Sequence, residues 1–117
     1  MNLYEHTIIA RQDTSPSEIK QLIEKYSKIV EKNEGEIIKT ENWGLLDLSY
    51  FIKKNKKGSY IHFKIKGRGN VIDELEKNEA IDKKLLRYLT VRVKKFDLEK
   101  NYFEKKEYDD KKESYKN

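Results

Sequence analysis

The spacing of apolar residues changes twice along this chain from two residues to three or four, and this order restricts the fold most. A strand-like run, Leu3–Ala10, is followed by a helical stripe and then by two strand-like runs. A second, shorter helical stripe and a last alternating run complete the order β-α-β-β-α-β. Two split βαβ units in 117 residues predict an α+β, ferredoxin-like sandwich, with a four-stranded antiparallel sheet and two helices on one face.

The first helix has the clearest boundary signals. Ser15 is the predicted N-cap, Pro16 suits the first helical position, and Glu18 completes a Ser-x-x-Glu capping box. Apolar side chains then recur at helical spacing at Ile19, Leu22, Ile23, Tyr26, Ile29 and Val30. Gly35 is predicted to stop the helix from just beyond its end.

The two middle strands are predicted to form a hairpin. Glu36–Ile52 is typical of a long strand, with a bulge or bend at Trp43-Gly44. The loop Lys53–Gly58 then leads to the strand Tyr60–Lys66. Alternation in that strand predicts a buried face of Ile61, Phe63 and Ile65 and an open face of Tyr60, His62, Lys64 and Lys66.

The last helix and strand are less sharply marked. Asn70 is a candidate N-cap for a helix that carries Val71, Ile72 and Leu75, and a loop through Glu79–Lys84 leads to the strand Leu86–Lys95. Alternation there predicts that Leu89, Val91 and Val93 face inward and that Tyr88, Thr90, Arg92 and Lys94 face outward. In the first strand, the pattern favours Tyr4, Ile8 and Ala10 inward, although Leu3 and Ile9 compete.

Charge divides the chain into a domain, residues 1–97, and a tail, residues 98–117. The tail has six acidic residues and six lysines, so the net charge of +5 comes from the domain. The tail is expected to form either an irregular helix or no ordered structure, and disorder is favoured past about Glu107, because such a composition buries little apolar surface.

Basic residues are separated from acidic ones within the domain. Leu48–Ile72 and Lys83–Lys95 contain no acidic residue, whereas Asp73–Asp82 contains five. This separation indicates a polyanionic partner such as RNA. The candidate RNA-binding residues are Lys53, Lys54, Lys56, Lys57, Lys64, Arg68, Arg87, Arg92 and Lys94. They place the positive charge on the sheet side of the fold, although a solvated hairpin tip would also favour lysine.

Aromatic residues on the predicted open face offer a second kind of contact. Tyr60, His62 and Tyr88 could stack on bases or pack against a protein partner. The chain lacks the glycine- and aromatic-rich signature of sheet-based RNA binders, so a protein partner is at least as well supported as base stacking.

Several classes of function are disfavoured. The chain has no cysteine, and His6 and His62 are too few for a metal site, so neither a metal nor another cofactor is expected. No apolar run is long enough for a membrane span, and the first strand starts too near Met1 for a signal peptide, so a cytoplasmic protein without a membrane partner is predicted.

An enzymatic alternative comes from the small acylphosphatases, which share this fold and use an arginine in the first loop and an asparagine on the second strand. Arg11 and Asn42 lie in comparable regions. However, Arg11–Glu18 contains no glycine, so a phosphate-cradling loop of backbone N–H groups is missing. We therefore expect no enzymatic activity and no small-molecule substrate.

Four segments resemble one known family in order and spacing. They are Tyr4-Glu5, Glu41–Tyr60, Val71–Glu76 and Leu85–Lys95. Together they resemble bacterial small-subunit ribosomal protein six, and Tyr4–Asp13 is similar to alphaproteobacterial forms.

The resemblance implies a structural constituent of the small ribosomal subunit. Family membership implies binding to the central domain of 16S ribosomal RNA during assembly, as a heterodimer with small-subunit ribosomal protein eighteen. By position, it also implies that Tyr4, Arg87, Arg92 and the Lys53–Lys57 hairpin lie near RNA or the partner. From the residues alone, a stand-alone RNA-binding or translational-repressor module is the alternative.

Overall fold

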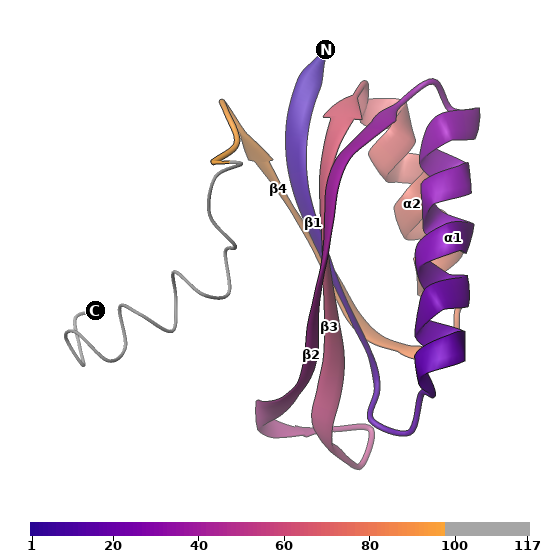
Figure 1. Cartoon of the computed structure of the whole chain (residues 1–117), viewed down its shortest axis with the longest axis vertical. Coiled ribbons are helices and arrows are strands. Elements are labelled where there is room, and N and C mark those ends of the chain that lie inside the picture. Colours follow the sequence, from indigo (N-terminus) through magenta and orange to yellow (C-terminus); the bar gives the residue numbers. More distant parts are fainter. Residues whose placement is uncertain (98–117) are drawn as a thin grey trace, which may run out of the picture.

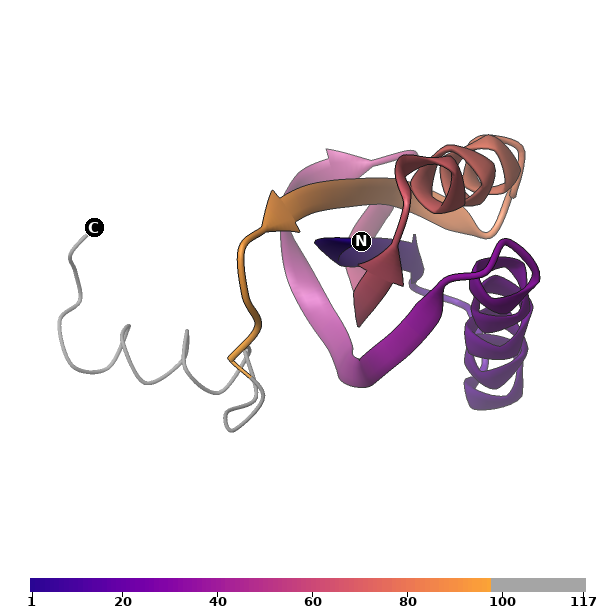
Figure 2. The same ribbon diagram turned by 90° about the horizontal axis from the view of Figure 1, so that it is seen from above.

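The computed structural model describes residues 1–97, in which six elements follow one another in the predicted order (Figure 1). They are β1 (Asn2–Arg11), α1 (Pro16–Lys32), β2 (Glu36–Ile52), β3 (Asn55–Gly67), α2 (Gly69–Ala80) and β4 (Leu85–Val93). The strands form one antiparallel sheet in the order β2-β3-β1-β4, with both helices on one side (Figures 1 and 2). The predicted ferredoxin-like sandwich is confirmed. The expectation of a disordered tail lies outside the described residues.

The core fills the space between the helices and the sheet face beneath them, here called the helix face. Tyr4, Ile8 and Ala10 of β1 are buried there, which confirms the favoured facing of that strand. The predicted capping box of α1 is also confirmed. The Ser15 hydroxyl accepts a hydrogen bond from the Glu18 amide at 3.2 Å, and the Glu18 carboxylate accepts one from the Ser15 amide at 2.9 Å.

Both helices differ slightly from prediction at one end. After α1, the residue with a left-handed backbone is Glu34, with φ of 65°, and the Gly35 amide then donates to the Val30 carbonyl at 2.8 Å. The predicted N-cap of α2 at Asn70 is wrong: Arg68 holds that place, and its side chain makes no capping hydrogen bond. β3 runs on to Gly67, so Arg68 alone connects strand to helix.

The β2–β3 hairpin confirms the predicted bulge and corrects the predicted loop. The register shifts between Asn42 and Gly44, where the Asn42 side-chain oxygen accepts from the Gly44 amide at 2.9 Å. Gly44 has φ of 83°, a conformation that glycine adopts without a steric penalty. The connection is a two-residue turn, Lys53-Lys54, because Ile52 pairs with Asn55.

The predicted facing of β4 is wrong, and its bounds are Leu85–Val93. Tyr88, Thr90 and Arg92 pair with Ile8, His6 and Tyr4, whose side chains lie on the helix face. Since paired residues of antiparallel strands point to the same side, Leu89, Val91 and Val93 lie on the uncovered side of the sheet, here called the open face. Alternation predicts the period but not the side, and a shift of one residue reverses every side chain.

Candidate protein- and RNA-binding surface

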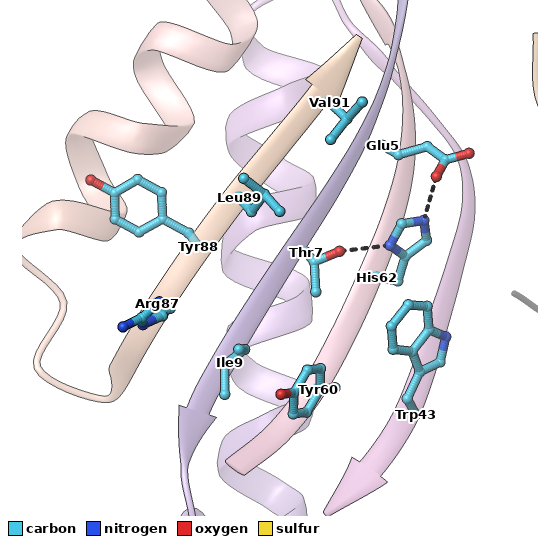
Figure 3. A pocket seen from close by; sticks show the side chains of 10 residues that line it. All are labelled: Glu5, Thr7, Ile9, Trp43, Tyr60, His62, Arg87, Tyr88, Leu89 and Val91. Atoms are coloured by element: carbon cyan, nitrogen blue, oxygen red, sulfur yellow. Dashed lines mark hydrogen bonds and ion pairs between the residues drawn. The ribbon is translucent and has the colours of Figure 1, made fainter. Parts of the chain in front are cut away.

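The open face carries a shallow hollow of about 390 Å³ (Figure 3). Its lining residues come from all four strands: Glu5, Thr7, Ile9, Trp43, Tyr60, His62, Arg87, Tyr88, Leu89 and Val91. Two apolar side chains of the edge strand β4 form one wall, with Leu89 64% exposed and Val91 49% exposed. Adjoining exposed apolar side chains of this kind make the hollow a candidate docking surface.

Stacked rings form the opposite wall. The Trp43 ring lies 4.9 Å from the His62 ring at 15° and 6.3 Å from the Tyr60 ring at 17°. His62 is buried, its Nδ1 is hydrogen-bonded to the Thr7 hydroxyl at 2.8 Å, and its Nε2 lies 3.5 Å from the Glu5 carboxylate (Figure 3). Burial, together with the nearby Lys64 charge, lowers the pKa of His62 to about 4, so the ring is neutral at pH 7. The expectation that His62 is open to solvent is wrong.

Lys64 also points to the open face, as predicted, but its side chain is buried rather than exposed. Its ammonium lies 3.4 Å from the Glu41 carboxylate, which Lys39 approaches to 3.4 Å as well, and both side chains of the Lys64–Glu41 pair are almost inaccessible. Burial raises the pKa of Glu41, but the hydrogen bond from the Trp43 indole and the Lys64 charge outweigh it and hold this pKa below its ordinary value. β3 lies between two other strands of the sheet. The Lys64 ammonium is therefore held in an internal ion pair with Glu41 and is not exposed for a contact with RNA.

Basic side chains gather at two ends of the sheet instead of spreading across it. At one end, the exposed lysines of the hairpin are Lys53, Lys54, Lys56 and Lys57. At the other end, Lys66, Arg92 and Lys94 line a shallow depression beside Asn2, and the exposed Arg68 follows β3 directly. The pairing of Asn2 with Gly67 and of Arg11 with Gly58 shows that these are opposite ends. The sheet therefore presents two basic ends with an apolar hollow between them.

The other predicted site residues are dispersed. Tyr4 is buried on the helix face, where its hydroxyl accepts from the Asn2 amide group at 3.1 Å. Tyr88 is 37% exposed, and its ring points away from the hollow (Figure 3). Arg87 lies on the open face, where it donates to the Tyr50 hydroxyl at 2.6 Å. Tyr60 keeps its predicted place in the wall of the hollow.

The apolar wall could not be recognised from alternation, which placed Leu89 and Val91 in the core. No local signal identifies it, because the polar Thr90 at the centre of the other row of β4 itself favours an outward facing of that row. Within residues 1–97 no group of three or more metal-ligating side chains comes together, and no helix is long and apolar enough to cross a membrane.

A ferredoxin-like sandwich with an apolar hollow between two basic ends defines a binding domain. A family model described as Ribosomal protein S6 matches residues 3–92. The chain is 76% identical over 113 residues to small ribosomal subunit protein bS6 of Pelagibacter ubique (strain HTCC1062), covering 97% of this chain and 93% of the relative. It is 43% identical over 99 residues to the bS6 protein of Caulobacter vibrioides (strain ATCC 19089 / CIP 103742 / CB 15), covering 85% of this chain and 79% of the relative.

The fold agrees with these relatives. The crystal structure of 30S ribosomal protein S6 from Thermotoga maritima superposes with a TM-score of 0.75 at 30% identity, covering 92% of this chain and 97% of that chain. The chain therefore belongs to the ribosomal protein S6 family and is a protein of the small ribosomal subunit, located with the ribosome in the cytoplasm. This confirms the family resemblance predicted from the sequence.

Proposed function

We propose that this chain binds the central domain of 16S ribosomal RNA together with small-subunit ribosomal protein eighteen during assembly of the small subunit, and that it is not an enzyme. The observation that carries the proposal is the apolar hollow between two basic ends. Phosphate contacts depend on charge and fix the position of a protein on RNA, so they suit the basic ends. A protein partner suits the hollow.

The apolar wall favours an assembly of two proteins over a stand-alone RNA-binding module. The cores of protein interfaces are rich in aromatic and apolar side chains and poor in charged ones. The hollow contains side chains of this kind at Leu89, Val91, Tyr60 and Trp43. An RNA-only mode of binding would leave Leu89 and Val91 exposed to solvent. The two-protein proposal accounts for these two exposed apolar side chains.

The hairpin lysines are expected to carry part of the RNA affinity. Replacing Lys54, Lys56 and Lys57 with glutamate should weaken binding to a 16S central-domain fragment and lower the slope of log affinity against log salt by about one unit for each phosphate that the protein no longer neutralises. Filter binding over a series of KCl concentrations measures both. The control variant reverses Lys20, Lys28 and Lys32, which are exposed on α1 and change the net charge equally. Equal effects of the two variants would contradict a specific role of the hairpin.

The hollow is expected to be needed for the protein partner. Leu89→Asp places a charge on the apolar wall and should weaken binding of protein eighteen at least about tenfold, as expected for a residue at an interface core. The side chain is 64% exposed, so stability should change by no more than about 0.5 kcal/mol. Isothermal titration calorimetry measures the affinity. Ile81→Asp is the matched control, because Ile81 is 80% exposed beside α2; if it impairs binding as much as Leu89→Asp, the hollow is not the docking site.

A further inference from the structure

The basic turn of the β2–β3 hairpin has an unfavourable backbone conformation. Lys53 and Lys54 have φ of 48° and 68°, so both central residues of the two-residue turn are left-handed. Asn-Gly or Asp-Gly sequences are favoured in such turns, whereas lysine has a steric penalty at both positions. A backbone of this kind persists where contacts around it hold it in place.

One set of contacts lies at the base of the turn. Asn55 is almost completely buried, and its side-chain amide donates to the carbonyls of Lys53 and Ile52 at 3.0 and 3.3 Å. The Asn55 side-chain oxygen accepts a hydrogen bond from the backbone amide of Gln12 at 3.0 Å. The Gln12 side-chain oxygen in turn accepts from the amides of Lys56 and Lys57, each at 3.1 Å. The loop between β1 and α1 thus fixes the backbone of the lysines that follow the turn.

A second contact crosses the open face. Between the pairs Asp47–Lys57 and Ile52–Asn55, the four residues Leu48–Phe51 of β2 stand opposite the single residue Lys56. The outer part of the hairpin curves toward β4 (Figure 2). There the Tyr50 hydroxyl accepts from the Arg87 guanidinium at 2.6 Å, and this guanidinium lies 5.3 Å from the centre of the Tyr50 ring. Tyr50 and Arg87 therefore join the two edge strands of the sheet.

Gly58 allows this curvature. A Cβ atom at Gly58 would lie 2.4 Å from Ile9 Cγ2 and 3.3 Å from the Ala10 carbonyl oxygen, and 3.5 Å from Leu48 Cδ2. The side chains of Ile9 and Leu48 therefore both lie close to Gly58, and a larger residue there would have to displace Ile9.

We propose, on the basis of the proposed function, that Gln12, Asn55, Tyr50 and Arg87 are positioning residues that hold the lysine turn as a preorganised phosphate-binding arm. Arg87 acts through Tyr50 rather than by contacting a phosphate. An arm that is already ordered loses less conformational freedom on binding RNA, so these residues contribute to RNA affinity without touching RNA.

The proposal is tested by binding of the full chain to a 16S central-domain RNA fragment over a series of KCl concentrations. Tyr50→Ala and Gln12→Ala leave the number of basic residues unchanged and are expected to weaken binding about three- to tenfold, the cost of ordering freed side chains. In a chain that already carries Lys54→Glu, Lys56→Glu and Lys57→Glu, neither should weaken binding further. Phe51→Ala is the matched control, because Phe51 is 66% exposed next to Tyr50.

Two further measurements separate positioning from direct contact. Arg87→Lys keeps the charge but removes the guanidinium, so it should bind as weakly as Tyr50→Ala, and the double variant should be no weaker than either. In the free protein, Gln12→Ala should speed hydrogen exchange at the backbone amides of Lys56 and Lys57. The free energy of unfolding of each variant is measured as well, so that a loss of RNA binding caused by global unfolding can be recognised.

The failures of the two proposals are distinguishable. Wild-type affinity in the triple lysine variant would overturn the RNA-binding role of the hairpin and this inference with it. Weakened binding in the lysine variant with wild-type affinity in Tyr50→Ala and Gln12→Ala would overturn only the positioning role. Wild-type affinity in Arg87→Lys, with weaker binding in Arg87→Ala, would show that Arg87 contacts phosphate directly.

Discussion

Replacing Glu79 with alanine is expected to lower the free energy of unfolding by about 2–5 kcal/mol, the cost of leaving a buried hydrogen-bonding partner unpaired and of the cavity left by the side chain. The Glu79 carboxylate lies 2.6 Å from His6 Nε2, and both side chains are completely inaccessible to solvent. The pair joins α2 to β1 in the centre of the sandwich. Alanine would leave His6 with a buried nitrogen and no partner on that side.

Urea denaturation of the two proteins measures this effect. Glu24→Ala is the control, since it removes an exposed glutamate from α1 and should change stability by no more than about 0.5 kcal/mol. A decrease below about 1 kcal/mol in Glu79→Ala would show that the pair contributes little beyond an ordinary surface contact.

The same pair is expected to make stability fall as pH rises above the ordinary glutamate pKa of about 4.5. The Thr90 hydroxyl donates its only hydrogen to the Glu76 carboxylate at 3.0 Å. The Thr90 oxygen must therefore be the acceptor in its 2.6 Å hydrogen bond with His6 Nδ1. A further proton must then lie between His6 Nε2 and Glu79, whichever of them holds it. Burial raises the pKa of Glu79, and the neighbouring Glu76 and Asp82 carboxylates act in the same direction.

The sign of this pH dependence follows from counting protons. Because burial raises the pKa of Glu79, the folded chain keeps a proton on this carboxyl to higher pH than the unfolded chain does. The folded state then binds more protons, so stability decreases as pH rises until the carboxyl ionises in the folded chain. Glu79→Gln has no carboxyl to titrate, so this decrease should disappear. A stability difference between the wild type and Glu79→Gln that does not change with pH would contradict a raised pKa of Glu79.

On the acidic side, His62 is expected to produce the opposite slope. Its pKa is lowered to about 4 by burial and by the Lys64 charge, so the unfolded chain takes up a proton below about pH 6.5 that the folded chain does not bind until about pH 4. The stability that His62 contributes is present above that window and is lost as pH falls through it. Urea denaturation at several pH values should therefore show the stability difference between the wild type and His62→Gln change as pH falls from about 6.5 to about 4 and stay constant above that window.

The elements of the fold could be predicted because their signals are local. The capping box of Ser15 and Glu18, the bulge at Trp43-Gly44 and the order of the apolar periods all depend on neighbouring residues. The facing of β4 could not be predicted in this way. Thr90 points inward because it forms hydrogen bonds with His6 and Glu76, which are distant in sequence, and this leaves the apolar row of β4 outside.

The candidate site shows the same division. The basic hairpin follows from composition alone, since four lysines within five residues cannot all be buried. The burial of Lys64 depends on Glu41 from the next strand and on the strands on both sides of β3. Cross-strand partners are not visible from alternation, so a lysine that was predicted to be part of a basic surface is a member of an internal ion pair.

Within residues 1–97, β4 pairs with β1 alone, so one of its edges is free in this part of the chain, and the open-face row of Leu89 and Val91 runs beside that edge. A free strand edge next to exposed apolar side chains promotes pairing with the strands of other molecules, and hence aggregation. The net charge of +5 opposes this only through repulsion, which salt screens. Chains made in excess of the proposed protein partner should therefore be the fraction most prone to aggregate in the cell, which would give a selective reason for matched synthesis of the two proteins.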